Sequence, residues 1–393
     1  DSLGAVELRS RLQEVVGEVA ELPSGLIFDA PTARQLAEYL HGLGGSSPNP
    51  AAVDGTAARS ERTAVAIRIT AAYARLPGGI ATPGAYGSMS ASGQDVASEV
   101  PIDRWNVKAV DASAAASGLG DAARSRLRYG AFVRGAQLFD ASAFAISNAE
   151  ASAMDPQQRL LLETGYESLH AGRLCRSELL RSTTAVYLGY SSSDFAQVVG
   201  ASPLGKSVYA ATGSAGSIAS GRLSYVLGLH GACALIDTAC SAGLVATGLT
   251  RAALVLNESD AAAVMAVNLI LSPDGAHTPF AIAGMTSATG KCHTFDKHTD
   301  GYARSEGVGA LVLKLGESTS VHRQSSAVRQ DGRSASLTAP NGQAQQGLLS
   351  AALTDGSTNV DALALNEAHG TGTALGDPIE MGSFAVEVLE RRG

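Results

Sequence analysis

The sequence predicts an α/β fold, in which short buried strands alternate with helices, and a small all-helical segment ahead of it. Five short apolar runs recur between residues 185 and 365, with long helix-like stretches between some of them. A run rich in Gly, Ser, Pro and Ala at 41–62 separates this region from the first forty residues. The 393-residue length and 45% hydrophobic content provide enough apolar surface for a large core.

The first forty residues have the pattern of one amphipathic helix followed by a shorter one. Apolar residues recur at three- and four-residue spacing from Leu3 to Val19, which places them on one face of a helix. Ser2 stands at the start of this helix. An Asp-Ser pair before a helix is also an ordinary N-cap signal, so Ser2 by itself does not indicate a function. We interpret 41–62 as a linker.

Continuous apolar runs of four to six residues predict strands that are covered on both faces. The runs are 185–189, 233–236, 262–267, 308–313 and 362–365, and an opening strand is predicted at 65–70. Arg68 in the opening strand is unusual, because an unpaired buried charge is costly. Helices are predicted at 155–169 and 241–257. Strands and helices in this alternation indicate a layered α/β domain.

Composition argues against several classes of function. The formal net charge of −8, without a Lys/Arg block, gives no reason to expect nucleic-acid binding. Cysteines at 175, 233, 240 and 292 have neither metal-site spacing nor a disulfide framework, which favours a reducing compartment. No run reaches the roughly 18 apolar residues of a membrane span. No secretory segment is visible, so we expect a soluble, cytoplasmic protein, and a start without Met indicates part of a longer one.

A candidate nucleophile, Cys240, lies between a predicted strand and a predicted helix. It follows the run 233–236 in the sequence Asp-Thr-Ala-Cys-Ser and precedes the Ala- and Leu-rich stretch 241–257. The unpaired N–H groups and the positive dipole end of a helix favour a thiolate at such a place. The ordinary alternative for a lone Cys in an apolar segment is a buried structural residue.

His369 is the second candidate, at the end of the run 362–365 in Glu-Ala-His-Gly-Thr-Gly-Thr. Gly370 and Gly372 allow the backbone to come close to a bound group such as a thioester, because glycine tolerates left-handed and crowded conformations. The pair lacks the further features of a dinucleotide-binding loop, so no nicotinamide cofactor is expected. The histidines at 230, 277, 293 and 298 are interpreted as solvated loop residues without a metal.

Together these motifs resemble the ketosynthase (condensing) domains of polyketide and fatty-acid synthases. Further motifs of that family occur in its order, namely Val-Pro-x-Asp-Arg-Trp at 100–105, Met-Asp-Pro-Gln-Gln-Arg-Leu at 154–160, Phe-Asp at 295–296, Asp-Gly-Tyr at 300–302 and Leu-Thr-Ala-Pro-Asn-Gly at 337–342. A papain-like cysteine hydrolase is a distant alternative, but its Cys-Gly-Ser-Cys-Trp signature does not surround Cys240.

The resemblance implies a thiolase-like domain of αβαβα layers over 63–393, incomplete here, that forms a homodimer. In this family a cysteine accepts an acyl group, and a malonyl-type carrier thioester loses CO2 and attacks it to give a 3-oxoacyl thioester. Cys240 is thereby implied as the nucleophile of an acyltransferase and His369 as the group that stabilises the enolate. No metal or redox cofactor is implied. Glu306 matches a glutamate near the family's active site, although a salt-bridged structural role is equally plausible.

Residues 1–40 are similar to the second half of an acyl carrier protein, on the pattern Phe28-Asp29-x-Pro31-Thr32 and the short helix after it. In that family the Ser of Asp-Ser-Leu carries 4′-phosphopantetheine, which implies Ser2 as its attachment site. The implied partners are acyl and malonyl thioesters on carrier proteins and the other domains of a modular polyketide synthase. About 40 residues bury little apolar surface, so we expect this segment to be poorly stable alone.

The sequence contains no counterpart of the Lys and second catalytic His that the family carries downstream. We therefore expect weak or absent condensation by this chain alone. A truncated, non-catalytic domain that binds acyl chains is the alternative.

Overall fold

The computed structural model describes residues 2–17, 20, 22–23, 25–30, 32–43, 66–316 and 321–392. The chain divides into two units. We call them the sheet unit (Val65–Lys291 and Asp300–Gln324) and the helical unit (Asp1–Ala64, Cys292–Thr299 and Ser325–Gly393). Each is described by itself.

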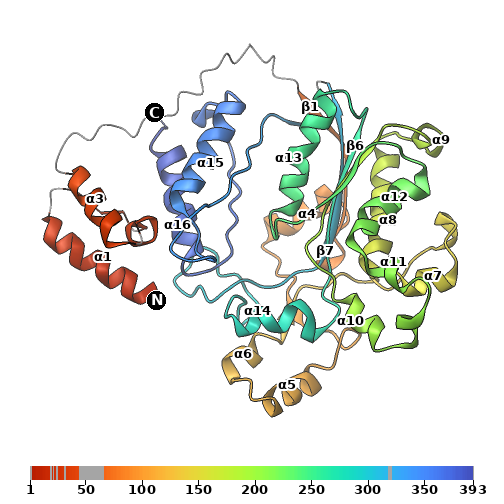
Figure 1. Cartoon of the computed structure of the whole chain (residues 1–393), viewed down its shortest axis with the longest axis horizontal. Coiled ribbons are helices and arrows are strands. Elements are labelled where there is room, and N and C mark those ends of the chain that lie inside the picture. The colour runs from red at the N-terminus through yellow and green to blue at the C-terminus, as the bar shows by residue number, and fades with distance from the viewer. Residues whose placement is uncertain are drawn as a thin grey trace. The chain divides into compact units, whose positions relative to one another are not determined.

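A six-stranded mixed sheet forms the centre of the sheet unit (Figure 1). Its strands, in spatial order, are β5 (Cys233–Ile236), β4 (Ala185–Gly189), β6 (Ala262–Asn268), β7 (Gly307–Leu315), β1 (Ile67–Arg75) and β8 (His322–Arg323). β5, β4 and β6 are parallel, whereas β7 and β8 are antiparallel to their neighbours. A separate two-stranded ladder joins β2 (Ser98–Glu99) and β3 (Tyr129–Gly130). The carboxyl ends of three parallel strands therefore meet at one edge of the sheet.

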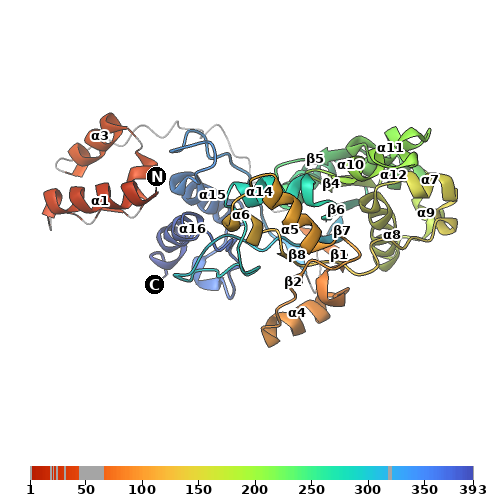
Figure 2. The same ribbon diagram turned by 90° about the horizontal axis from the view of Figure 1, so that it is seen from below.

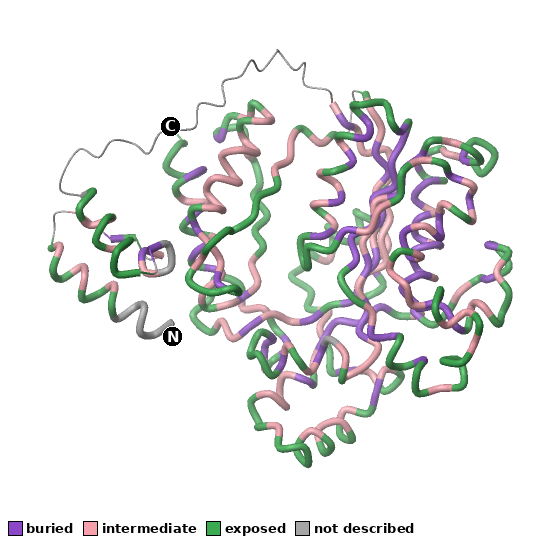
Figure 3. The backbone as a smooth tube through the Cα atoms, in the orientation of Figure 1, coloured by how far each residue is buried: buried purple, intermediate pink, exposed green. Residues whose placement is uncertain are grey.

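Helices cover both faces of this sheet. In Figure 1, α8 (Pro156–Ala171) and α12 (Gly216–Leu227) lie on one face and α13 (Ala242–Val255) lies on the other. Figure 3 shows buried backbone concentrated in the sheet and in the helices beside it. The remaining helices of this unit are α4 (Pro83–Ser92), α5 (Val107–Ala116), α6 (Asp121–Ser125), α7 (Asn148–Ala153), α9 (Arg176–Leu179), α10 (Phe195–Gly200), α11 (Ala210–Ser214) and α14 (Thr278–Ile282). Figure 2 shows α4 standing off the sheet, and it buries none of its residues.

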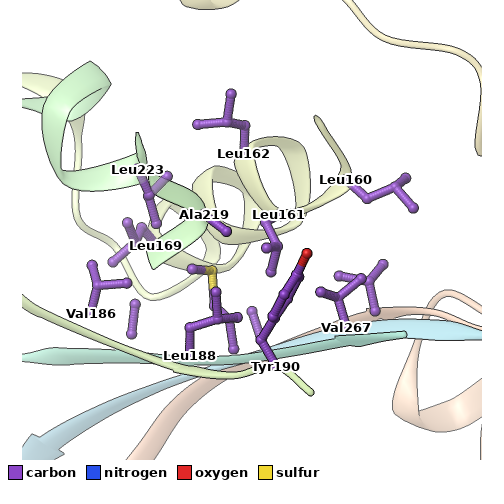
Figure 4. Close-up of a cluster of buried hydrophobic side chains, with 14 of the residues drawn as sticks. Leu160, Leu161, Leu162, Leu169, Val186, Leu188, Tyr190, Ala219, Leu223 and Val267 are labelled. Atoms are coloured by element: carbon purple, nitrogen blue, oxygen red, sulfur yellow. The ribbon is translucent and has the colours of Figure 1, made fainter. Parts of the chain in front are cut away.

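The largest hydrophobic core lies between the sheet and the helices α8 and α12 (Figure 4). Leu161 of α8, Leu188 of β4 and Leu223 of α12 are all at most 2% exposed. Burying one such side chain contributes about 1.5–3 kcal/mol. A second cluster, with Ile236 and Ala246, packs α13 onto the other face. Burial on both faces holds the end of β5 and the start of α13 in place.

The strands predicted at 185–189, 233–236, 262–267 and 308–313 are confirmed as β4, β5, β6 and β7. The opening strand is confirmed at a shifted position, because β1 begins at Ile67 and continues to Arg75. β5 is contacted by α12 on one face and by α13 on the other, but it is an edge strand, and Cys233 at its start is exposed. A short apolar run does not distinguish an edge strand from a central one.

In the helical unit, residues 2–43 form α1 (Ser2–Val16), α2 (Leu26–Asp29) and α3 (Ala33–Leu43). A small core is built around Leu22 and Leu26, which are 0% and 2% exposed. Gln13 on α1 fixes the following turn by donating to Gly17 and Ala20. α3 continues to Leu43, and the rest of the stretch interpreted as a linker, 44–62, lies outside the described residues together with Val19.

The rest of the helical unit contains α15 (Gly342–Asp355), α16 (Gly376–Phe384) and the helical turns Val360–Ala362 and Ala385–Leu389. The strand predicted at 362–365 is wrong, because 363–373 has no regular secondary structure. A strand needs a neighbour to pair with its backbone groups, and the described residues of this unit form no other strand. The apolar run Ala-Leu-Ala-Leu therefore lacks the sheet that would organise it.

Candidate active site

Cys240 stands on the turn between β5 and α13, as predicted. β5 ends at Ile236 and α13 begins at Ala242. The turn is closed by backbone hydrogen bonds from Ser241 to Thr238 and from Ala242 to Ala239, at 3.3 and 3.1 Å. The Cys240 thiol is exposed, which excludes the buried structural interpretation.

The first turn of α13 provides a positive environment next to this thiol. α13 is 14 residues long and has no acidic residue in its first turn. Ser241 directly precedes the helix, but its side chain does not cap the helix N–H groups. Its hydroxyl donates instead to the carbonyl and hydroxyl oxygens of Thr238, at 2.9 and 3.0 Å. The positive end of the helix dipole therefore favours an anion at the start of this helix.

Two neighbours define the surroundings of the turn within the sheet unit. A Cβ atom placed on Gly189, at the end of β4, would lie 2.6 Å from the Gly243 nitrogen, so the start of α13 packs directly on this glycine. Burial raises the pKa of Tyr302, the Arg304 charge lowers it, and the electrostatic influence of Cys240 raises it further.

His369 lies in the irregular loop that precedes α16, and its side chain is exposed. Glu380 of α16 accepts hydrogen bonds from the backbone N–H groups of His369 and Gly370. Asp377 accepts from Gly372 and Thr373, at 3.0 and 3.3 Å. Two carboxylates of one helix therefore hold the backbone on both sides of Thr371.

The glycines of this loop allow its backbone to lie close to another segment of the same chain. Gly370 and Gly372 have φ of +56° and +69°, the left-handed region that glycine adopts readily. A Cβ atom on Gly372 would lie 1.2 Å from the Cys292 carbonyl oxygen. The Asp377 carboxylate also accepts from the Phe295 N–H at 2.8 Å. The loop 366–373 is thereby fixed against 292–295. The glycines therefore allow a close approach of the backbone, as predicted, but the group that they approach is another segment of the chain.

The candidate residues are distributed over both units. Cys240 belongs to the sheet unit, whereas His369 and Ser2 belong to the helical unit. Ser2 is the first residue of α1. Asp377 and Glu380 were not singled out from the sequence. The signal that could have found them is a pair of carboxylates three residues apart near the start of the helix that follows a Gly-rich loop, with Asp377 in its first turn.

Glu306 has the surroundings of a structural residue. Its side chain is fully buried and pairs with Arg104, which donates to it from Nη2 at 2.9 Å and from Nε at 3.2 Å. The backbone N–H groups of Val133 and Ile270 also donate to it, at 2.8 and 3.0 Å. Four hydrogen bonds to one buried carboxylate tie three loops together. Of the two interpretations left open for Glu306, the geometry supports the structural one.

The Met-Asp-Pro-Gln-Gln-Arg-Leu motif starts α8. Asp155 caps the helix by accepting from the Gln157 N–H at 2.7 Å. The Arg159 side chain of α8 donates to the Gln137 carbonyl.

The interpretation of His277 as a solvated loop residue is wrong. His277 is 1% exposed, and its ring lies 5.7 Å from that of Trp105. Burial, together with the nearby Arg304, lowers the pKa of His277 to about 4. Helical turns on both sides of His277 carry it into the interior, which a loop-like sequence does not reveal.

Neither a metal centre nor a membrane span is found in the part of the chain that the structure describes. No group of three or more His, Cys, Asp or Glu side chains there has the arrangement of metal ligands. No helix among these residues is long and apolar enough to cross a bilayer.

Comparison with known proteins places these motifs in one family. The model of the beta-ketoacyl synthase N-terminal domain matches residues 64–318, and that of the beta-ketoacyl synthase C-terminal domain matches residues 322–392. Polyketide synthase GfsB of Streptomyces halstedii is 41% identical over 391 residues, which are 97% of this chain. The spectinabilin polyketide synthase system protein NorC of Streptomyces orinoci is 38% identical over 390 residues, or 96% of this chain. The chain spans 7% and 17% of these two proteins.

Solved structures give the same result. The ketosynthase from module 6 of the bacillaene synthase of Bacillus subtilis 168 aligns with a TM-score of 0.72 and 29% identity, over 83% of this chain and 54% of that chain. The oxazolomycin ketosynthase domain OzmH KS7 of Streptomyces albus JA3453 aligns with a TM-score of 0.74 and 30% identity, over 82% of this chain and 56% of that chain. The fold is that of a thiolase-like ketosynthase domain. With its Cys240 turn, its His369 loop and these matches, the chain belongs to the beta-ketoacyl synthase family.

Proposed function

We propose that this chain is the part of a polyketide synthase that takes part in carrier-dependent condensation, with Cys240 as the nucleophile. The observation that supports this most is the exposed thiol on a turn at the start of a 14-residue helix, in a chain of the ketosynthase family. In the first step the Cys240 thiolate attacks the carbonyl carbon of an acyl-carrier thioester. The bond to the cysteine sulfur forms and the carrier thiolate leaves, which makes the chain an acyltransferase.

In the second step a malonyl-type extender loses CO2, and the resulting enolate attacks the acyl-cysteine carbonyl. Collapse of the tetrahedral intermediate releases the Cys240 thiolate and leaves a 3-oxoacyl thioester on the carrier. We assign to His369 the stabilisation of the enolate oxygen. This role is supported by the Glu380 and Asp377 carboxylates, which hold the backbone at His369 and at Gly372, and by the exposure of His369. Fixed donors at a developing negative charge supply much of the rate in such reactions.

We propose Ser2 as the attachment site of 4′-phosphopantetheine in a partial carrier domain at 1–40. Its hydroxyl is the group that a phosphodiester requires, and the start of the 15-residue α1 favours a bound phosphate. The bound group would supply the thiol that carries the acyl chain. The domain boundaries at 40 and 62, the other synthase domains as partners and a cytoplasmic location remain predictions.

We also propose a homodimer that forms through β5. This strand is at the edge of the sheet, and the helices that pack on it expose Tyr225 of α12 and Leu244 of α13 by 87% and 78%. An open edge flanked by large apolar side chains favours pairing with another strand. A second copy would satisfy the outer backbone groups of β5.

The experiment that tests the condensation separates its two steps. The chain is incubated with an acyl thioester and then with a malonyl-loaded carrier protein, and mass spectrometry follows the acyl-enzyme and the 3-oxoacyl product. Cys240→Ala should abolish both signals, whereas His369→Ala should keep the acyl-enzyme and lose the product. Acylation without any product in the wild-type chain would support the weak condensation predicted for this chain alone. Absence of acylation would favour a non-catalytic domain.

A further inference from the structure

A hydrogen-bonded chain of side chains holds the turn that carries Cys240. Asp237 is the first residue after β5, and its Oδ1 atom accepts from the Ala239 N–H at 3.0 Å. The same Oδ1 atom accepts from the Ser191 hydroxyl, also at 3.0 Å. Ser191 lies two residues beyond the end of the neighbouring strand β4. One carboxylate thus connects the ends of two parallel strands.

The backbone that this carboxylate holds is strained. Ala239, directly before Cys240, has φ of +53°, in the left-handed region that residues with a Cβ atom seldom adopt. Such a conformation persists only when the surrounding contacts impose it. The hydrogen bond from the Ala239 N–H to Asp237 is one of those contacts, and it acts on the residue next to the nucleophile.

Ser191 is a suitable anchor because its own segment is fixed at several points. The Tyr190 N–H donates to the Ile236 carbonyl at 3.0 Å, which continues the ladder from β4 to β5. Three residues beyond Ser191, the buried Asp194 carboxylate accepts from the N–H groups of Leu271 and Ser272, at 2.9 and 2.8 Å. The segment 190–194 therefore links the ends of all three parallel strands.

We propose that Asp237 and Ser191 are positioning residues for Cys240. The Ser191 hydroxyl orients the Asp237 carboxylate, and the carboxylate fixes the Ala239 peptide, so that the thiol is presented in one orientation. This inference rests on the proposed function, since it is the attack of Cys240 on a thioester that requires such an orientation. A misplaced nucleophile reduces the rate even when the substrate still binds.

The test measures acylation of Cys240 in the full chain by the N-acetylcysteamine thioester of a short fatty acid. The thiolate attacks the carbonyl carbon, the new C–S bond forms and the N-acetylcysteamine thiolate leaves. Peptide mass spectrometry resolves Cys240 from the other three cysteines at each time point. The compared variants are Ser191→Ala, Ser191→Thr, Asp237→Ala and Asp237→Asn. Ser192→Ala is the matched control, because this exposed hydroxyl makes no hydrogen bond to any residue that the structure describes.

We expect Ser191→Ala and Asp237→Ala to lower the acylation rate at saturating thioester by about three- to tenfold, the effect of losing one hydrogen bond. The thioester concentration for half-saturation should change little. Ser191→Thr and Asp237→Asn keep the hydroxyl and an acceptor oxygen, so both should stay close to the wild-type rate. Circular-dichroism melting checks that each variant is folded.

Wild-type rates in both Ser191→Ala and Asp237→Ala would overturn the inference and leave the proposed function intact. The inference would also fail if Asp237→Asn were as slow as Asp237→Ala, because a charge and not an acceptor would then be required. A wild-type chain that is not acylated at Cys240 would overturn the proposed function and this inference with it.

Discussion

Asp377 is a buried carboxylate, 3% exposed, whose oxygens satisfy three backbone N–H groups. Two of the donors are Gly372 and Thr373, just after His369, and the third is Phe295. Buried donors that lose their acceptor carry a penalty of about 1–3 kcal/mol each. The side chain of Asp377 therefore controls how firmly the His369 loop is held.

Replacing Asp377 by Ala should release this loop. We expect the amides of Gly372 and Thr373 to exchange with deuterium about ten- to a hundredfold faster, because their opening costs less free energy. Hydrogen-exchange mass spectrometry of peptides that cover 366–375 measures this. Asp361→Ala, an exposed change in the same unit, is the control and should leave the exchange unchanged. Equal protection in the two variants would contradict the role given to Asp377.

The lowered pKa of His277 predicts that the stability of the folded chain depends on pH. Its pKa falls from an ordinary value of about 6.5 to about 4 in the folded chain, through burial and the nearby Arg304. Between these values the unfolded chain binds more protons, so the free energy of unfolding decreases as the pH falls from 6.5 toward 4. The full effect is about 3 kcal/mol.

The change His277→Gln removes this titration. Melting temperatures measured from pH 4 to pH 7 should therefore depend less on pH in the variant than in the wild type. Parallel curves for the two chains would mean that His277 is protonated in the folded state at the same pH as in the unfolded state.

The position of Cys240 on a turn between a strand and a helix could be predicted from the sequence, because the apolar run and the helical stretch that flank it are local features. Residues that act through contacts with distant segments could not be predicted. The roles of Asp237 and Ser191 depend on β4 and β5 being neighbours, although 46 residues separate the two. The burial of His277 depends likewise on Trp105, far away in the sequence.

At the level of elements, the close contact between β4 and α13 positions the turn that carries Cys240. Gly189→Ala would put a Cβ atom 2.6 Å from the Gly243 nitrogen and 2.8 Å from the Ala242 carbonyl carbon. Backbone atoms must then move, at a cost of about 1–3 kcal/mol. We expect a lower melting temperature and slower acylation of Cys240.

The matched control for this change is Gly87→Ala in α4, where a Cβ atom would meet nothing within 4 Å. It should leave the melting temperature unchanged or raise it slightly, since Ala favours a helix more than Gly does. If Gly189→Ala behaved like Gly87→Ala in both assays, α13 would not depend on this close contact.

Four of the predicted strands agree with the structure because each is an apolar run with a neighbour to pair with in the sheet. The run 362–365 has the same pattern and is not a strand, since pairing depends on other segments and not on the run itself. For the same reason the edge position of β5 and the antiparallel β7 and β1 could not be derived from local periodicity.

At the level of the whole molecule, the proposed dimer can be tested by the molar mass of the protein in solution. Light scattering after size exclusion should give about twice the 39.9 kDa of one chain. Tyr225→Glu places a charge on the exposed surface beside β5 and should shift the population to monomer. Leu138→Glu, on an exposed loop elsewhere in the sheet unit, is the control and should remain dimeric. A monomeric wild-type chain would contradict the dimer.

The family of the chain could be predicted from its ordered motifs, whereas the arrangement of its units could not. Motif order is a property of the sequence, and the family matches over 64–318 and 322–392 confirm it. The division into a sheet unit and a helical unit, in which 292–299 groups with 325–393, depends on contacts between distant segments. One example is the hydrogen bond from the Thr294 hydroxyl to the Gly370 carbonyl.

The most direct test of this account is the identity of the acylated residue. After incubation with an acyl thioester, peptide mass spectrometry should find the acyl mass on Cys240 in the wild-type chain and on no cysteine in Cys240→Ala. Acyl mass on Cys175, Cys233 or Cys292, or unchanged acylation of Cys240→Ala, would contradict the assignment of Cys240 as the nucleophile.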